Sequence, residues 1–394
     1  MSASGVSYNA PTEVKTMRRI VWVTLAFVSG GLIAYSYGQI PMERVLSRIT
    51  VPSQGDLRGL VDTKGFPSKA EQMDAIAKMC QDAERDAILK NQKSFGLTEQ
   101  TGFIAGICPH DDYMIAAPVY LHVQRYMKAR TLILIGNAHW SEAFGIRNKL
   151  IFGDFRQWRG PYGPVKISGV QDKIAARLSK DGYTVNRKLV ETEHSLEALV
   201  PYLQYLNRNV EIVPILIPFS DWNTIDKLGI ELADVVAGIC KDNHWKLGQD
   251  LAVLCSSDGQ HYGDYGWPYY NYHPFGCDAD GYKKSLALDD RMISDYLAGE
   301  ARSEKVRQLF ATLVDQSDIS HYKVTWCGRF AVSFGINFAI HLAGKAENRV
   351  LSGSLLRTGS SLAGPWLPLE TYGLGTTSDS NFHHFVTYFA VGFK

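Results

Sequence analysis

The sequence predicts an α/β fold with a mainly parallel or mixed central sheet flanked by helices on both faces, preceded by one N-terminal transmembrane helix. Short apolar runs rich in β-branched residues alternate with stretches of helical periodicity. Strands covered on both faces are continuously apolar, and parallel strands need crossover connections that are usually helices. The transmembrane helix is predicted from a separate feature, an uncharged stretch close to the N-terminus.

The uncharged stretch, residues 20–40, is long enough to span a bilayer as a helix. Three basic residues precede it and none follows immediately, which predicts that residues 1–19 are cytoplasmic and that the main domain lies on the non-cytoplasmic side. A cleaved signal peptide is the first alternative, because residues 34–36 loosely fit the small-x-small cleavage pattern, and the protein would then be exported. A buried helix of a soluble core is the second. The long polar segment before residue 20 and the length of the uncharged stretch favour a retained membrane anchor.

Composition excludes some classes of function. The chain has 394 residues, 45% of them hydrophobic, and a net charge of +1 without a basic stripe, so a nucleic-acid partner is not expected. No C-x-x-C pair occurs, which excludes zinc-ribbon and thioredoxin patterns. The six cysteines are Cys80, Cys108, Cys240, Cys255, Cys277 and Cys327.

The domain begins after a segment typical of a linker. Residues 41–67 are rich in Pro, Gly and Ser, and residues 68–394 contain no clear boundary, so they are predicted to form one α/β domain. A helix is expected over 68–90, where Ser68 and Glu71 fit a capping box.

Strands and helices then alternate along the domain. Strands are expected at 102–108, 131–137, 211–218 and 250–257, and a buried C-terminal strand at 385–394. Helices are expected at 114–129, 170–180, 195–207, 224–239, 280–299, 303–315 and 328–343.

Histidines follow three of the predicted strands. His110 comes after the first, His139 after the second, and Asp258 and His261 after the strand at 250–257. Ligands of open parallel sheets bind outside the carboxyl ends of the strands. A single histidine there is most often structural, but three at one edge indicate a metal site or acid–base chemistry.

Two further segments carry candidate site residues. Cys327 stands before a predicted helix, where the helix dipole favours a thiolate ligand; a buried inert thiol is the alternative. His194 and Glu197 are expected on the first turn of a helix. His194 can supply a ligand or a hydrogen bond to one, and the neighbouring carboxylates favour the hydrogen-bonding role.

Five motifs in order resemble the MEMO family, called AmmeMemoRadiSam system protein B in prokaryotes, which shares its fold with the class III (LigB-type) extradiol dioxygenases. The motifs are "CPHDDY", "GNAHW", "ETEHSLEALVPYLQYL", "SSDGQHYG" and "TWCGRF", and the resemblance extends from about residue 100 to the C-terminus. It implies metal binding by His110, His139 and Cys327. Asp258 and His261 match other pocket residues of the family, with His261 at the position of the dioxygenases' acid–base histidine.

The resemblance leaves the identity of the metal open. The dioxygenases hold ferrous iron with two histidines and a glutamate; a thiolate in place of the carboxylate makes copper or zinc as reasonable as iron. The family's usual "PHAGY" reads "PHDDY" in this chain. Asp111 is therefore a hydrogen-bond acceptor beside the first ligand or an added carboxylate ligand, and the first is favoured.

Three functions from different classes fit these residues. The first is metal-dependent redox chemistry in which His261 moves protons and Asp258 orients His261 or the substrate. The second is a non-catalytic module that binds a peptide or a small molecule, and the third is an accessory subunit of a membrane complex. The aromatic-rich stretch 261–277 is a ligand-binding wall or lid, a small separate core, or a surface resting on the membrane.

Overall fold

The computed structural model describes Arg44, Leu46 and residues 51–267, 271–364 and 366–394. These residues belong to one compact unit, 41–394. The predicted cytoplasmic tail, 1–19, and the predicted transmembrane segment, 20–40, lie outside the described residues. Within the described part of the chain, no helix is both long enough and apolar enough to cross a membrane.

A mixed β-sheet forms the centre of the domain, and its strand order among the described residues is β1-β5-β6-β8-β3-β9-β2-β13-β12-β11. The four central strands are parallel: β8 (Glu211–Ile217), β3 (Thr131–Asn137), β9 (Leu251–Ser256) and β2 (Ala105–Cys108). β13 (His384–Phe393) pairs antiparallel with β2, and β12 (Ser352–Ser360) antiparallel with β13. The predicted mainly parallel or mixed sheet is confirmed.

The remaining strands are short and lie at the margins. They are β1 (Leu57–Arg58), β4 (Leu150–Phe152), β5 (Gln157–Gly160), β6 (Gly163–Ile167), β7 (Tyr183–Val185), β10 (His261–Gly263) and β11 (Gly299–Glu300).

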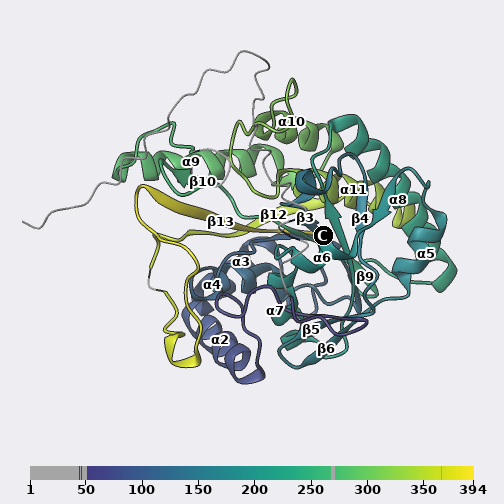
Figure 1. The fold of residues 1–394 in the computed structure, drawn as a ribbon, viewed down its shortest axis with the longest axis horizontal. Coiled ribbons are helices and arrows are strands. Elements are labelled where there is room, and N and C mark those ends of the chain that lie inside the picture. The colour runs from purple at the N-terminus through teal and green to yellow at the C-terminus, as the bar shows by residue number, and fades with distance from the viewer. Residues whose placement is uncertain (1–43, 45, 47–50, 268–270, 365) are drawn as a thin grey trace, which may run out of the picture. The chain divides into compact units, whose positions relative to one another are not determined.

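Helices cover both faces of the sheet, as predicted. Figure 1 shows α2, α4 and α7 below β12 and β13, with α9, α10 and α11 above them. Two hydrophobic clusters, one on each face, result from this arrangement. The helices are α2 (Ala70–Ala83), α3 (Arg85–Phe95), α4 (Tyr113–Gln124), α5 (Val170–Arg177), α6 (Arg187–Thr192), α7 (Val200–Leu206), α8 (Trp222–Asn243), α9 (Ala279–Tyr296), α10 (Ser303–Leu313) and α11 (Arg329–Glu347).

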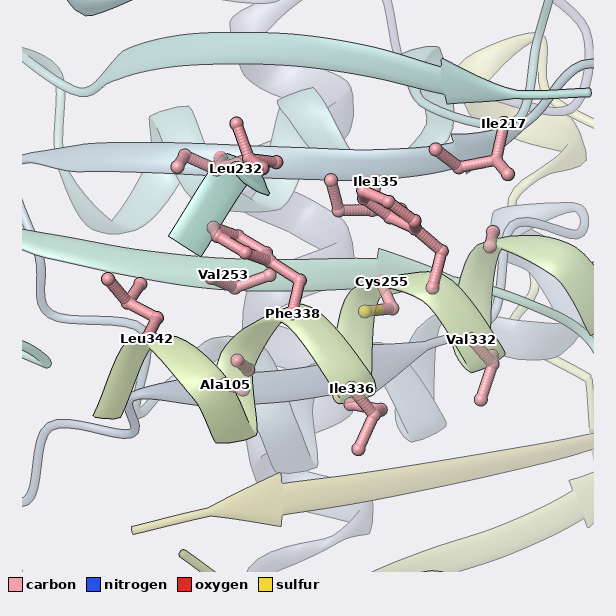
Figure 2. Packing of buried hydrophobic residues seen from close by; sticks show 14 of the residues in the cluster. Ala105, Ile135, Ile217, Leu232, Val253, Cys255, Val332, Ile336, Phe338 and Leu342 are labelled. Carbon is pink, nitrogen blue, oxygen red and sulfur yellow. The ribbon is translucent and has the colours of Figure 1, made fainter. Parts of the chain in front are cut away.

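Helix α11 approaches the strands unusually closely at one residue. Figure 2 shows its buried side chains over β3 and β9. A Cβ atom at Gly335 would lie 2.3 Å from Sγ of Cys255 and 3.4 Å from Ile135. Glycine is therefore required here by close packing and not by its backbone angles.

The helix predicted over 68–90 is broken into two. Glu84 adopts a non-helical conformation between α2 and α3, and its carboxylate accepts hydrogen bonds from His122 and Arg357. The predicted capping residue is also wrong: the amides of Ser68 and Lys69 donate to the side chain of Gln72, not to that of Glu71.

Part of the predicted linker packs against the domain. Within 41–67, strand β1 pairs in parallel with β5, and Arg58 is buried. The Arg58 guanidinium forms an ion pair with Glu197 at 2.5 Å and lies 4.4 Å from the centre of the Trp158 ring. This segment therefore reaches the turn that carries the predicted site residue Glu197.

Candidate metal centre

The sheet brings the predicted site residues together at one edge. β3, β9 and β2 are adjacent and parallel, so their carboxyl ends lie side by side. His110, His139 and Asp258 each follow one of these ends by two residues. Cys327 does not follow a strand; it lies two residues before the start of α11.

A cavity of about 290 Å³ opens at this edge. Its wall contains every predicted site residue except Glu197, together with aromatic side chains and residues from both ends of the domain. It contains no lysine or arginine among the described residues. The lining residues are Asp62, Phe66, His110, Asp111, Asp112, His139, Trp140, His194, Asp258, His261, Trp267, Tyr322, Thr325, Cys327, Thr377, Ser378 and Val386.

The hydrogen bonds of His110 determine which ring nitrogen can bind a metal. Nδ1 lies 2.8 Å from Oγ of Ser256, and that hydroxyl donates its own proton to the carbonyl of Ser195 at 2.6 Å. Nδ1 must therefore carry the ring proton, which leaves the lone pair on Nε2. Burial lowers the pKa of His110 to about 3. The neighbouring histidines also lower it, whereas the Asp258 carboxylate acts in the opposite direction. The ring is neutral, as a ligand must be.

His139 is oriented in the same way by a carboxylate. Its Nδ1 lies 2.9 Å from Oε1 of Glu193, and its main-chain N donates to Oε2 at 2.8 Å. Burial raises the pKa of Glu193, but the attraction and hydrogen bond of His139 outweigh burial, so the pKa lies well below its usual range. The carboxylate is ionised and accepts a hydrogen bond from Nδ1–H, which leaves Nε2 of His139 as the coordinating nitrogen.

Cys327 completes the group. Its Sγ lies 3.4 Å from Nε2 of His110 and accepts a hydrogen bond from the main-chain N of Asp258 at 3.2 Å. Burial, and then the Asp258 carboxylate, raise the pKa of the Cys327 thiol. Burial and the Asp258 carboxylate therefore outweigh the thiolate stabilisation that was expected from the helix dipole. A bound cation is needed to make this sulfur a thiolate.

The donor set fits a transition-metal ion. One donor atom of each of His110, His139 and Cys327 lies within 4.8 Å of the other two. In tetrahedral coordination by nitrogen and sulfur, adjacent donors stand about 3.6 Å apart, close to the 3.4 Å between His110 and Cys327. We call His110, His139 and Cys327 the strand-end site.

His194 lies beside the strand-end site, on the turn before α7. Its ring stacks on His139 with centres 4.8 Å apart, and the centre of the His110 ring is 5.6 Å away. Its main-chain N donates to Oε1 of Glu193. Glu197, expected beside His194, starts a 3-10 turn and directs its carboxylate to Arg58 and to the main-chain N of Val61 and Asp62.

Asp258 and His261 form a pair at the edge of the site. Oδ2 of Asp258 lies 3.5 Å from Nε2 of His110 and 3.8 Å from Nε2 of His261. Burial raises the pKa of Asp258, but the two histidines outweigh burial and lower it to about 2. The His261 ring contacts Trp267 at 4.8 Å between centres, and its enclosed Nε2 has no hydrogen-bond partner among the described residues.

The two aspartates that depart from the family pattern have separate partners. Oδ2 of Asp111 accepts a hydrogen bond from Tyr388 at 2.5 Å. Asp112 accepts from the main-chain N of Thr377 at 2.6 Å and from its hydroxyl at 3.1 Å. Asp112 thus links the start of α4 to the segment between β12 and β13.

The aromatic-rich stretch 261–277 divides between two of the expected roles. Tyr262 is buried and stacks on Phe385, with ring centres 4.8 Å apart, as in a small core. Trp267 stacks on His384 at 3.8 Å and lines the cavity. Residues 268–270 lie outside the described residues.

Sequence reasoning missed several residues that shape the site. Glu193 is the most important, since it orients His139 and also accepts from the amides of His194 and Ser195. The signal was present, because a glutamate directly before His194 stands in the same motif. Ser256, which selects the His110 tautomer, ends β9, while Asp62 and Phe66 fall in the predicted linker and gave no signal.

Comparisons with known proteins show the family to which the chain belongs. The family model described as Memo-like protein matches residues 76–356, well over half of the chain. A MEMO1 family protein of Thermococcus kodakarensis is 25% identical over 292 residues, covering 70% of this chain and 90% of the relative. One of Caldivirga maquilingensis is 29% identical over 213 residues, covering 48% of this chain and 68% of the relative. The chain belongs to the Memo-like protein family.

Proposed function

We propose that this protein binds one transition-metal ion at the strand-end site and carries out redox chemistry on a small ligand in the adjoining cavity. The observation that carries the proposal is the convergence of His110, His139 and Cys327, whose donor atoms lie within 4.8 Å of one another at the wall of the cavity. Two imidazoles and one thiol suit iron, copper or zinc, and redox chemistry requires iron or copper.

The residues around the ion have defined tasks in this proposal. Ser256 and Glu193 hold the Nδ1 protons of His110 and His139, so both rings keep their coordinating orientation. A bound ion with an open coordination position would supply electron exchange with dioxygen or with an oxidisable ligand. The ion would also stabilise the Cys327 thiolate, which the metal-free site disfavours.

His261 is the residue proposed to move protons. Its side chain is 29% exposed, and its unpartnered Nε2 lies next to the cavity. Asp258 is ionised and lies 3.8 Å from that nitrogen, close enough to orient the ring and to stabilise its charged form. The surrounding Trp140, Trp267 and Tyr322 offer an apolar wall against which a flat ligand can stack.

Metal content tests the first half of the proposal. Purified protein is reconstituted anaerobically with iron(II), copper(I) or zinc in separate samples, and the retained metal is measured by mass spectrometry. We expect about one ion per chain, and loss of retention in His110→Ala and His139→Ala. His321→Ala is the matched control, because His321 is an exposed histidine paired with Asp318. Equal retention in all variants would overturn the proposal.

Turnover separates an enzyme from a binding module built on the same site. His261→Ala leaves the three ligands in place, so it is expected to retain the ion and to lose oxygen consumption with an oxidisable ligand. Wild-type protein that holds its ion and binds ligands, but consumes no oxygen with a panel of phenols, thiols and amines, would favour the binding module.

We also propose that residues 20–40 anchor the protein in a membrane with the α/β domain on the non-cytoplasmic side. The support is the uncharged length of this stretch and the basic residues before it. The expected results are cleavage of the domain by added protease in intact spheroplasts, its protection in sealed inside-out vesicles, and resistance of the full chain to alkaline extraction. Isolation in mild detergent as a free monomer would argue against membership of a membrane complex.

A further inference from the structure

A second group of side chains of the types that bind metal ions lies outside the strand-end site. One donor atom of each of Asp264, Cys277 and His383 lies within 4.8 Å of the other two. We call these three residues the surface cluster. None of them lines the cavity.

Strand pairing holds two members of the surface cluster in place. Asp264 directly follows β10, and His383 directly precedes β13. The two strands pair antiparallel, with Gly263 opposite His384. The main-chain N of Asp264 donates to the carbonyl of His383 at 3.1 Å. Nδ1 of His383 lies 3.0 and 3.2 Å from the carboxylate oxygens of Asp264. Ligands placed on paired strands keep their separation without a bound ion.

Cys277 reaches the pair from a third segment. It directly precedes Asp278, whose side chain caps the first turn of α9, and the carbonyl of Gly276 accepts a hydrogen bond from the buried Tyr262 at 3.1 Å. Figure 1 shows α9 next to β10. The thiol is half-buried. Burial and the Asp264 carboxylate raise the pKa of Cys277, so the sulfur stays a thiol until a cation approaches.

We propose that Asp264, Cys277 and His383 bind a divalent transition cation, with zinc as the best match. Sulfur, imidazole nitrogen and carboxylate oxygen are the three protein ligand types of zinc, and alkaline-earth ions are not bound by thiolates. Because the cluster is open to solvent, water would complete the coordination. The ion would join the two ends of the stretch 264–277 to the start of β13.

The functional consequence concerns the wall of the cavity. Trp267 lies within the stretch that the ion would join at both ends, and it contacts His261 and His384. A cation at the surface cluster would thus stabilise the segment that carries this tryptophan. The inference stands without the proposed redox function, because it shares no ligand with the strand-end site.

Cobalt(II) provides a direct probe, because cobalt bound to a thiolate absorbs in the near ultraviolet. The full chain carrying Cys327→Ala is titrated with cobalt, so the strand-end thiolate cannot contribute. We expect a thiolate band in this background, its loss on adding Cys277→Ala, and binding weakened by more than about tenfold on adding His383→Ala. The matched control is His321→Ala, which alters a surface His–Asp pair without a cysteine. No band in the background, or a band that survives Cys277→Ala, would overturn the proposal.

Alkylation of the wild-type chain gives a second measurement that needs no change in the strand-end site. Cys277 is the one cysteine of the six that is not buried, so iodoacetamide should label it first. Zinc is expected to slow this labelling by about tenfold or more, and His383→Ala or Asp264→Asn to remove the protection. Equal labelling rates with and without zinc would contradict the proposal.

Discussion

The carboxylate of Glu193 accepts hydrogen bonds from both the ring Nδ1 and the main-chain N of His139, at 2.9 and 2.8 Å. One side chain therefore sets both the tautomer of the histidine and the position of its backbone at the end of β3. Groups that orient metal ligands in this way contribute substantially to affinity, although they do not touch the ion.

Glu193→Gln is expected to weaken metal binding at the strand-end site by about 10- to 100-fold, because the amide keeps the shape but loses the charge that holds the Nδ1 proton. Competition with a chromophoric chelator measures the change. Glu191→Gln is the matched control, since Glu191 pairs with Lys188 on the same short helix. Equal affinity in the two variants would show that Glu193 has no such role.

Arg58→Met is expected to cost about 3–5 kcal/mol of unfolding free energy, because Glu197 would remain buried without the guanidinium that pairs with its carboxylate. Adding Glu197→Gln should restore part of the loss, since a neutral amide is cheaper to bury than an unpaired carboxylate. Urea denaturation of the single and double variants measures this coupling.

Arg156→Met provides the comparison for that experiment. Arg156 and Asp172 form a surface pair with both side chains more than half exposed, so the loss should stay below about 1 kcal/mol. A similar loss in Arg58→Met would mean that the buried pair contributes no more than the exposed one.

Glu84 predicts a pH dependence of stability. Burial raises its pKa, but hydrogen bonds from His122 and Arg357 outweigh burial and hold the pKa below the ordinary value of 4.5. The stability that Glu84 contributes is therefore fully present above its ordinary pKa. It is lost as the pH falls through the lower pKa of the folded state. Glu84→Gln should be about 1–3 kcal/mol less stable than wild type at pH 7.

Denaturation at pH 7, 5, 4 and 3 checks this sign. The gap between wild type and Glu84→Gln should narrow in the most acidic samples. A gap that widens toward acid would contradict the assignment. Glu71→Gln, on the exposed face of α2, should track wild type throughout.

Gly335→Ala is expected to destabilise the protein by about 1–3 kcal/mol, because its methyl group would lie 2.3 Å from Sγ of Cys255. Removing that sulfur with Cys255→Ala should recover part of the loss. Gly344→Ala, in the same helix with open space around it, should instead raise the melting temperature slightly. If both glycine variants behaved alike, helix propensity and not packing would explain the result.

Strands with a continuous apolar run could be predicted from the sequence, and strands that are short or of mixed composition could not. β3 and β8 each contain a continuous apolar run and are buried along their whole length, so composition alone indicates them. β12 contains glycine, serine and arginine, and is a strand because it pairs with β13. The helix break at Glu84 could not be predicted either, because its partners His122 and Arg357 are distant in the chain.

The candidate site, too, could be predicted only in part from the sequence. The sequence by itself determined that His110, His139 and His261 follow strands, because apolar runs end abruptly at these polar residues, and that Cys327 precedes a helix. Only the tertiary structure decided the roles of the glutamates around His194. Glu193 faces His139 and Glu197 faces Arg58. The physical reason is that both partners come from distant segments, so no local pattern reveals which carboxylate points into the site.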